Sequence, residues 1–435
     1  MKFKTFLFVT RGPLLIGGAV ALATLVPQAK AHITLDRSYP AVVCPSAVGG
    51  GTESISLPTK GLSTVLVSGK TITLHGQKNV VVRGSSTPTF VSGNPGSEVA
   101  FESISGSSTA DTVCSVGGAD QWFIGGSASV TSQGILQIIN SGLSDSTVQI
   151  NPFGAKGALA PISVRVKANS SANLKLSSIA PGEESVALHV VTDSGRVTSY
   201  LLDHRVNGLK DLGASFVTAV AAPATTSYLA GLYGSSTKAA TTLRFLVPGN
   251  IDANVHLSMY SGGGKFTPLG FDSYPVHHQK VVDVSLPQIS LSTPYGIEIS
   301  SDQPIFASAL TRTTTGGTDF AWANQLTPLS NFKINLAGSA ANFLFVGSSP
   351  ALRANWIDMH GRSQSIMIYG DTSALWHPIG ALNGVSFTIL TKNPVYGGAL
   401  VSNVGGGLNY LPLLPNQLVS RAHTPQEDLR ALARH

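Results

Sequence analysis

The stretch Tyr228–Gly231 (YLAG) opens a segment that the chain repeats, and this segment decides the fold. It continues through Leu243–Gly249 (LRFLVPG) and ends at Asp302–Ala307 (DQPIFA). Short β-prone runs separated by Gly, Pro, Asp and Asn indicate strands joined by turns. Within the run Val282–Leu286 (VDVSL), apolar residues alternate with others. This is the period of a strand with one buried face.

The same order of motifs occurs three times along the chain. Trp122–Gly125 opens the first copy, Tyr228–Gly231 the second and Phe343–Gly347 the third, which is shorter and looser. The openings lie about 100 residues apart, which suits a β-sandwich of about seven strands and is too long for a solenoid repeat of about 20–50 residues. We therefore predict an all-β protein of tandem immunoglobulin-like β-sandwich units.

The region before the first copy is expected to form an atypical β unit, because terminal units of repeat arrays often diverge. Each repeat ends in a Gly-rich bend before an aromatic or apolar strand, and we expect this strand to cross into the next unit's sheet. A final helical pattern is too short to be stable alone and predicts disorder. The predicted organisation is a leader at 1–31, an N-terminal β cap unit at 32–120, β-sandwich repeats at 121–226, 227–341 and 342–416, and a disordered tail at 417–435.

Residues 1–31 have the features of an export leader. Lys2, Lys4 and Arg11 precede an apolar stretch from Pro13 to Val26, and the segment ends in an A-x-A cleavage pattern. An uncleaved anchor is the alternative, although the apolar stretch is short for a membrane span of about 20 residues. In either case the body is expected to be secreted or extracytoplasmic, and to meet a membrane only through this segment if it stays uncleaved.

The chain has two cysteines, Cys44 and Cys114. In an exported protein two cysteines most simply pair with each other. Two separately buried thiols are the alternative, and a metal site is disfavoured because no further His or Cys stands at ligand spacing. The sequence therefore predicts a disulfide bond that links the cap unit internally.

The charge excludes two classes of partner. Charged residues are 11% of the chain and the formal net charge is +6, but four of the basic residues lie in the leader. Without them, 24 basic residues remain against 22 acidic ones. This balance leaves no basic footprint for nucleic acid and none for anionic lipid.

The phosphate-loop, nucleophile-elbow and calcium-loop motifs are absent from the sequence. Gly262–Lys265 (GGGK) is followed by Phe266, which has no hydroxyl for magnesium, and no G-x-S-x-G is present. Acidic residues are few, and Asp193 and Asp302 occupy equivalent turns of the first two copies. We predict no catalytic residue, no cofactor and no metal, although a triad assembled in space from distant residues stays open.

The most conspicuous histidines are His204, beside Asp203, and the pair His277 and His278. The pair precedes the strand expected at Val281–Leu286, where successive side chains point to opposite faces. We therefore expect surface histidines that do not share one metal ion.

Aromatic residues are the remaining candidates for ligand binding. Trp122, Tyr228 and Phe343 hold equivalent opening positions, which indicates core packing. Trp376 lies in the loop-like Ala374–Pro378 (ALWHP) and is the candidate for stacking on a ligand such as a sugar ring.

Several short motifs are similar to those of a known family. The chain resembles a domain-of-unknown-function family of exported actinobacterial cell-envelope proteins. The matching pieces are Cys44-Pro45, the Cys114 segment that leads to Trp122–Gly125, Leu243–Gly249 and Asp319–Trp322 (DFAW). The resemblance implies an envelope location and a non-catalytic character, and it transfers no site residues.

The leading hypothesis is an exported, non-catalytic structural or adhesive protein of the cell envelope. The alternative is a module that binds cell-wall glycan or another envelope protein through loops at one end of the sandwiches. A hydrolase ranks third. The partner and the oligomeric state are not decided by the sequence.

We expect N-terminal sequencing of the exported protein to begin at His32, directly after the A-x-A pattern. A mature protein that begins at Met1 would contradict cleavage and favour the anchor.

Overall fold

The computed structural model describes most of the chain between the leader and the tail. The described residues are 42–46, 52–56, 62–67, 70–75, 79–83, 87–92, 99–105, 108–233, 239–262, 264–287, 293–313, 319–358, 360–402 and 408–415. They belong to one compact unit, Arg37–Ser420. The leader at 1–31 and the tail at 417–435 lie outside the described residues, so both stay predictions. Among the described residues, no helix has the length and apolar character to cross a membrane.

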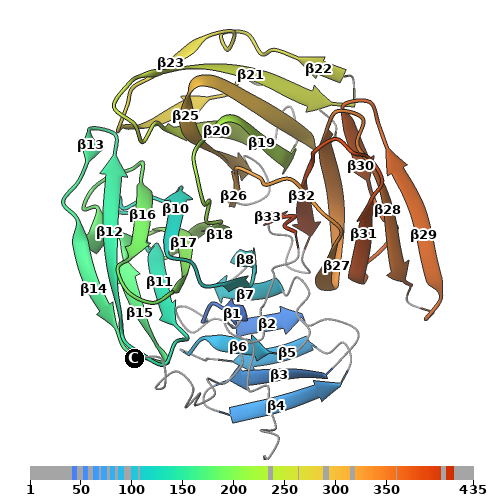
Figure 1. The fold of residues 1–435 in the computed structure, drawn as a ribbon, viewed down its shortest axis with the longest axis horizontal. Coiled ribbons are helices and arrows are strands. Elements are labelled where there is room, and N and C mark those ends of the chain that lie inside the picture. Colours follow the sequence, from blue (N-terminus) through green and yellow to red (C-terminus); the bar gives the residue numbers. More distant parts are fainter. Residues whose placement is uncertain are drawn as a thin grey trace, which may run out of the picture. The chain divides into compact units, whose positions relative to one another are not determined.

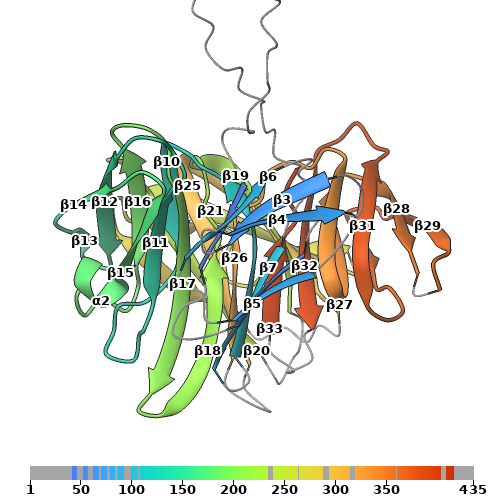
Figure 2. The same cartoon turned by 90° about the horizontal axis from the view of Figure 1, so that it is seen from below.

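The described chain is almost entirely β-strand, and its strands fall into four units. The first unit holds β1 (Val42–Cys44), β2 (Thr52–Ser56), β3 (Leu62–Val67), β4 (Lys70–His75), β5 (Asn79–Arg83), β6 (Thr89–Ser92), β7 (Val99–Ser105), β8 (Ser108–Val113) and β9 (Ser115–Val116). The second unit holds β10 (Asp120–Ile124), β11 (Ile135–Asn140), β12 (Ser146–Gly154), β13 (Gly157–Ala158), β14 (Ile162–Val166), β15 (Ser170–Lys175), the short helix α2 (Leu176–Ile179), β16 (Ala187–Thr192), β17 (Thr198–Asn207) and β18 (Lys210–Val217). Figure 2 shows α2 beside β15 and the long β17–β18 hairpin.

The third and fourth units complete the chain. The third unit holds β19 (Ala224–Leu232), β20 (Ala239–Leu246), β21 (Ala253–Ser261), β22 (Gly264–Phe266), β23 (Tyr274–Val276), β24 (Val281–Ser285), β25 (Tyr295–Thr313) and β26 (Phe320–Asn324). The fourth unit holds β27 (Phe332–Gly347), β28 (Ala351–Ile357), β29 (Ser363–Tyr369), β30 (Ser373–Trp376), β31 (Leu382–Ile389), β32 (Val395–Ser402) and β33 (Leu408–Pro412).

All four units share one antiparallel strand order, which confirms the all-β repeat architecture (Figure 1). In each unit, one sheet ends on the unit's last strand, in the orders β5-β2-β7-β8, β15-β11-β17-β18, β24-β20-β25-β26 and β30-β27-β32-β33. The first unit therefore follows the same plan as the others, and it differs in the added strand β9 and the disulfide.

The two sheets of a unit face each other across an apolar core. In the second unit, Phe123 and Leu188 of one sheet share a cluster with Leu136 and Leu201 of the other. The third and fourth units have the same arrangement. Each of these units is therefore a β-sandwich with its own core.

The last repeat begins earlier than predicted. The strand equivalent to β10 and β19 is the first part of β27, at Phe332, and not Phe343–Gly347. Phe343–Gly347 instead belongs to the second half of β27, which occupies the place of β20 in the strand order. The prediction of equivalence between Phe343 and Tyr228 is therefore wrong. The predicted boundaries at 226/227 and 341/342 fall inside β19 and β27.

The prediction that the last strand of each unit crosses into the next sheet is also wrong. β18, β26 and β33 pair with β17, β25 and β32 of their own units. The last strands instead contact one another in a closed cycle, in which β8 contacts β18, β18 contacts β26, β26 contacts β33 and β33 contacts β8.

One strand in each later unit is buried on both faces, and it joins the units. On β20, Leu243 and Phe245 point into the core of the third unit, whereas Leu246 packs against Ile124 of the second. Apolar residues on successive positions therefore serve two different cores. The same division holds on β27, where Phe343 and Phe345 face their own core and Leu344 and Val346 face the third unit, and on β11, where Leu136 and Ile138 face their own core and Ile139 faces the first unit.

The predicted disulfide is present between Cys44 and Cys114, whose Cα atoms lie 4.5 Å apart. The bond closes a loop with a sequence separation of 70. Closing a loop of this length lowers the entropy of the unfolded chain and so stabilises the folded protein by roughly 4 kcal/mol. Nearby, the hydroxyl of Tyr200 donates to the carbonyl of Val43, and it accepts the backbone N–H of Ser115 at 2.8 Å. The disulfide-bonded end of the first unit is thereby hydrogen-bonded to the second unit.

Arg244 joins the second and third units. Its side chain is 2% exposed, and its guanidinium group donates to Asp283 at 2.7 and 2.8 Å. It also donates to the carbonyls of Gly126 at 2.6 Å and Val186 at 3.0 Å. Burial alone would raise the pKa of Asp283, but the hydrogen bonds and charge of Arg244 bring it below its ordinary value.

A second buried ion pair lies in the same joint. The indole Nε1 of Trp322 donates to the fully buried carboxylate of Asp203 at 2.9 Å, and Arg205 binds that carboxylate at 2.7 Å. Burial lowers the pKa of Arg205, but the negative charge of Asp203 more than offsets this, so the pKa is raised. The guanidinium of Arg244 lies 4.9 Å from the Trp322 ring, which links the two pairs through a cation–π contact.

The third and fourth units meet through aromatic stacking and a close approach of backbones. The rings of Tyr228 and Tyr396 stack with centroids 4.1 Å apart. Gly231 has a φ of +78°, and a Cβ placed on Gly398 would lie 2.0 Å from the carbonyl oxygen of Ala230. Only glycine at position 398 allows these two backbone segments to approach so closely.

We expect Arg244→Met to lower the free energy of unfolding by about 3 kcal/mol, because it leaves Asp283 without its partner in a buried joint. Urea unfolding of the full chain would measure the loss. Arg165→Met is the matched control, since Arg165 and its partner Asp145 are 75% and 36% exposed and the change should cost less than about 1 kcal/mol. Equal losses in the two variants would contradict the assignment.

Candidate functional site

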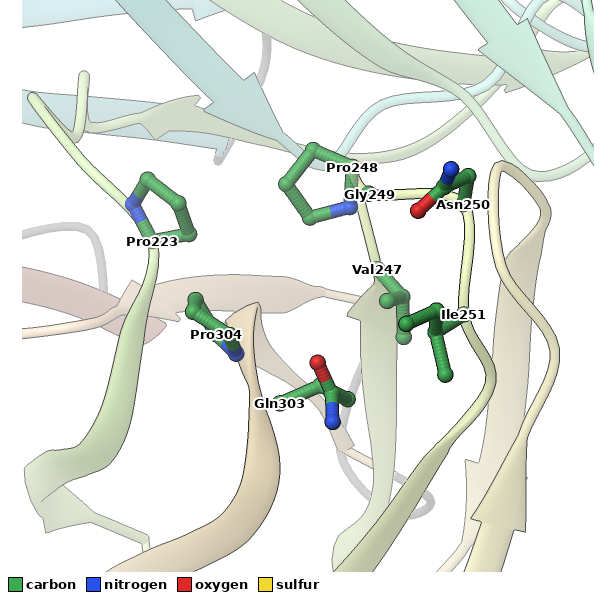
Figure 3. A pocket seen from close by; sticks show the side chains of 8 residues that line it. All are labelled: Pro223, Val247, Pro248, Gly249, Asn250, Ile251, Gln303 and Pro304. Carbon is green, nitrogen blue, oxygen red and sulfur yellow. The ribbon is translucent and has the colours of Figure 1, made fainter.

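A small pocket lies at one end of the third unit (Figure 3). Its walls come from the turn after β20, from β25 and from the residue before β19, and its volume is about 240 Å³. The lining residues are Pro223, Val247, Pro248, Gly249, Asn250, Ile251, Gln303 and Pro304. Two of the motifs that define the repeat, Leu243–Gly249 and Asp302–Ala307, therefore meet at one concave surface.

The pocket forms where β25 passes from one sheet of the unit to the other. Up to Ser301 this strand pairs with β21, and from Phe306 it pairs with β20. Pro304 has no N–H to continue a ladder, so it suits the point of transfer. Asp302 stabilises the bend, because its carboxylate accepts the backbone N–H of Asn254 at 2.8 Å. The predicted turn at Asp302 is thus a change of sheet within one strand.

A carboxylate with two imidazoles adjoins the pocket. Asp252 follows the lining residue Ile251, and its two oxygens lie 2.9 Å from His277 Nδ1 and 2.5 Å from His278 Nδ1. The backbone N–H of His278 also donates to this carboxylate, at 2.9 Å. The hydrogen bond from that N–H, together with those from the two imidazoles, lowers the pKa of Asp252 well below its usual value.

The convergence of His277 and His278 corrects the expectation that they point to opposite faces. That expectation assumed a regular strand, but β23 ends at Val276 and β24 begins at Val281. Both imidazoles turn toward Asp252 and are 65% and 46% exposed. No group of three potential ligands among the described residues is arranged to hold a metal ion.

The pocket suits binding better than reaction. Its lining offers proline rings, the side chains of Val247 and Ile251, and two amide side chains, Asn250 and Gln303. Neither an acid, an imidazole nor a nucleophile is among these lining residues. Such a surface can hold a small apolar group and fix it with amide hydrogen bonds.

Asp319 is an acid whose pKa is raised, and it lies outside the pocket. Burial raises the pKa of Asp319 to about 6, although backbone N–H donors oppose the shift. Its oxygens accept the N–H groups of Leu408 at 2.6 Å and Phe320 at 2.9 Å. Leu408 belongs to the fourth unit, so Asp319 serves the joint between the third and fourth units.

Trp376 is not available for ligand stacking, contrary to the prediction. It lies on β30, where its side chain is 5% exposed and its ring stacks on Phe343 with centroids 5.1 Å apart. Trp356 and Phe387 contact the same ring. The run that resembled a loop in the sequence is a strand that carries a core residue.

The buried roles of Arg244, Asp283 and Asp203 were not predicted from the sequence. A signal was present for Arg244, because a charge interrupts an apolar run that does not alternate. A run of this kind indicates a strand buried on both faces, where a charge requires a fixed partner.

Comparison with known proteins identifies the family. A family model described as a family of unknown function, DUF5719, matches residues 52–365. The chain belongs to DUF5719. The match begins in the first of the four units described above and ends in the fourth, and it includes both motifs of the pocket. Membership confirms the resemblance to a family of unknown function, while the export and the actinobacterial origin that the resemblance implied stay predictions.

The other comparisons add little. No curated protein matches the chain. Among solved structures, a crystal structure of a tetra-tandem repeat in the extending region of a large adhesion protein is similar at 12% identity, with 86% of this chain and 93% of that chain covered. Its TM-score is 0.12, so it carries no argument about the fold or the function of this chain.

We expect Trp376→Ala to lower the free energy of unfolding by about 3–5 kcal/mol, because it removes a large aromatic side chain from a packed core. Tyr369→Ala is the control, since Tyr369 lies on the neighbouring strand β29 and is 77% exposed. Its effect should stay within about 0.5 kcal/mol. Urea unfolding compares the two, and a stable Trp376→Ala variant that has lost a ligand would restore the stacking hypothesis.

Proposed function

We propose that this protein is an exported, non-catalytic structural or adhesive protein of the cell envelope. The observation behind the proposal is that buried polar contacts and partly buried aromatic contacts fix each unit to its neighbours. Between the second and third units these are the bonds of Arg244 and Trp322, and between the third and fourth the stack of Tyr228 on Tyr396. Such joints suit a body that bears load or presents a surface.

Two further observations support a role without catalysis. The pocket lining carries no side chain that could act as acid, base or nucleophile. Asp283 and Asp319, whose pKa values are lowered and raised respectively, are engaged by Arg244 and by backbone N–H donors at the joints between units. Perturbed pKa values of this kind also arise in structural networks.

The pocket favours a second candidate function, a module that binds envelope glycan or another envelope protein. Its apolar rim includes Ile251, which is 60% exposed, beside the amides of Asn250 and Gln303. An exposed apolar side chain between polar groups is typical of a small recognition site.

Co-sedimentation of the full chain with isolated cell envelopes tests the main proposal. We expect the protein to sediment with the envelopes and to release no soluble glycan or peptide fragments, as measured by mass spectrometry of the supernatant. Fragments that accumulate with time and with protein concentration would instead show an enzyme and would overturn the proposal.

The same assay separates the two candidates. If the pocket is the binding site, Ile251→Asp should weaken retention by about tenfold, because it places a charge on the apolar rim. Ile379→Asp is the matched control, since Ile379 is fully exposed in the fourth unit. Equal retention of the two variants would remove the pocket from the binding surface and leave the structural role.

A further inference from the structure

The strand β29 forms an open edge of the fourth unit. It has seven residues, and each pairs with β28 in an unbroken register from Ser363↔Ile357 to Tyr369↔Ala351. No other strand among the described residues pairs with it. With respect to the described part of the chain, its second row of backbone N–H and C=O groups is therefore open to another strand.

The composition of β29 differs from that of the other long edge strands. Its sequence, SQSIMIY, contains no charged residue and no proline, and these are the usual devices that prevent edge pairing. The other long edges whose side chains are described carry a charge, as in Lys70 of β4, Arg165 of β14, Lys175 of β15 and Asp283 of β24, or they contact a neighbouring unit, as β19, β26 and β33 do.

Apolar side chains are exposed on both faces of this edge. Ile368 is buried in the core, but Ile366, two positions earlier on the same face, is 40% exposed. On the opposite face Met367 and Tyr369 are 47% and 77% exposed. A further strand at this edge would cover these side chains as well as the backbone groups.

We propose that two copies of this chain pair through β29, antiparallel about a two-fold axis at Ile366. This register places Ile366 opposite its counterpart, Ser365 opposite Met367, and Ser363 opposite Tyr369. No like charges face each other. The sheet that contains β28 and β31 then continues across the axis into the second copy.

The charges that flank β29 select the antiparallel pairing. Arg362 precedes the strand and Asp371 follows it shortly, and both are exposed. Antiparallel pairing brings Arg362 of each copy toward Asp371 of the other, whereas parallel pairing would bring like charges together. Arg362 keeps its bond from Nε to Asp358 at 3.0 Å, and its Nη2 lies 3.5 Å from His360 Nδ1. Its Nη1 group and the second hydrogen of Nη2 remain able to donate.

Sedimentation velocity of the full chain over a wide range of concentrations tests the proposal. We expect a monomer–dimer equilibrium, and we expect Ser365→Lys with Met367→Lys to weaken it by about tenfold or more, because the two lysines face each other across the axis. The matched control, Asn355→Lys with Ile357→Lys, adds the same charge to the same face one strand away and should still dimerise. A chain that stays monomeric, including one that binds extended peptides instead, or equal losses in both variants, would overturn the proposal.

Disulfide trapping tests the register. Opposed Cα atoms in antiparallel pairs lie about 4.5–5.5 Å apart, within disulfide reach, so Ile366→Cys should cross-link two copies on oxidation. Ser363→Cys should not, because its counterpart lies about 20 Å away along the strand. The native cysteines are already bonded to each other. Cross-linking of Ser363→Cys alone, or of neither variant, would contradict pairing about Ile366.

Discussion

The hydrogen bonds of the Arg244 guanidinium group are the interaction on which the rest of the structure depends. The side chain of this cation is 2% exposed. If its partners were displaced, the unpaired buried charge would lower the free energy of unfolding by several kcal/mol. Those partners come from both sides of a joint, because Asp283 belongs to the third unit and the carbonyls of Gly126 and Val186 belong to the second. The second and third units can therefore meet in one arrangement only, the one that satisfies this group.

The same constraint appears in other chemical forms at the remaining joints. The first and second units share the hydrogen bonds of Tyr200, and the third and fourth share the Tyr228–Tyr396 stack and the contact between Gly398 and Ala230. A unit cut out alone would expose the outward face of its doubly buried strand. The repeats thus differ from independent domains on a flexible string, which supports a load-bearing or surface-presenting role.

Local patterns predicted the strands and the places where they end. Alternation gave β24 and its neighbours, and the turn residues at Asp193 and Asp302 mark the points where the chain passes between the sheets of a unit. The same patterns failed where both faces of a strand are apolar. The run at Phe343 was mistaken for an opening strand because a doubly buried strand and an aromatic opening look alike in sequence. Trp376 was misread for the related reason that its partners, Phe343 and Phe387, are distant along the chain.

By itself, the sequence determined the all-β class, the existence of repeats and the pairing of Cys44 with Cys114. These follow from period-two alternation, from motif order and from there being two cysteines, all of which are legible without knowing any contact. The tertiary structure alone decided that the first unit shares the strand order of the others. It also decided that Arg244 is buried between two units and does not lie on the surface, and that His277 and His278 both contact Asp252. The physical reason is that the surroundings of a strand's outward face are set by the distant segment that packs against it. The same holds for the direction of a side chain that lies beyond the end of a strand.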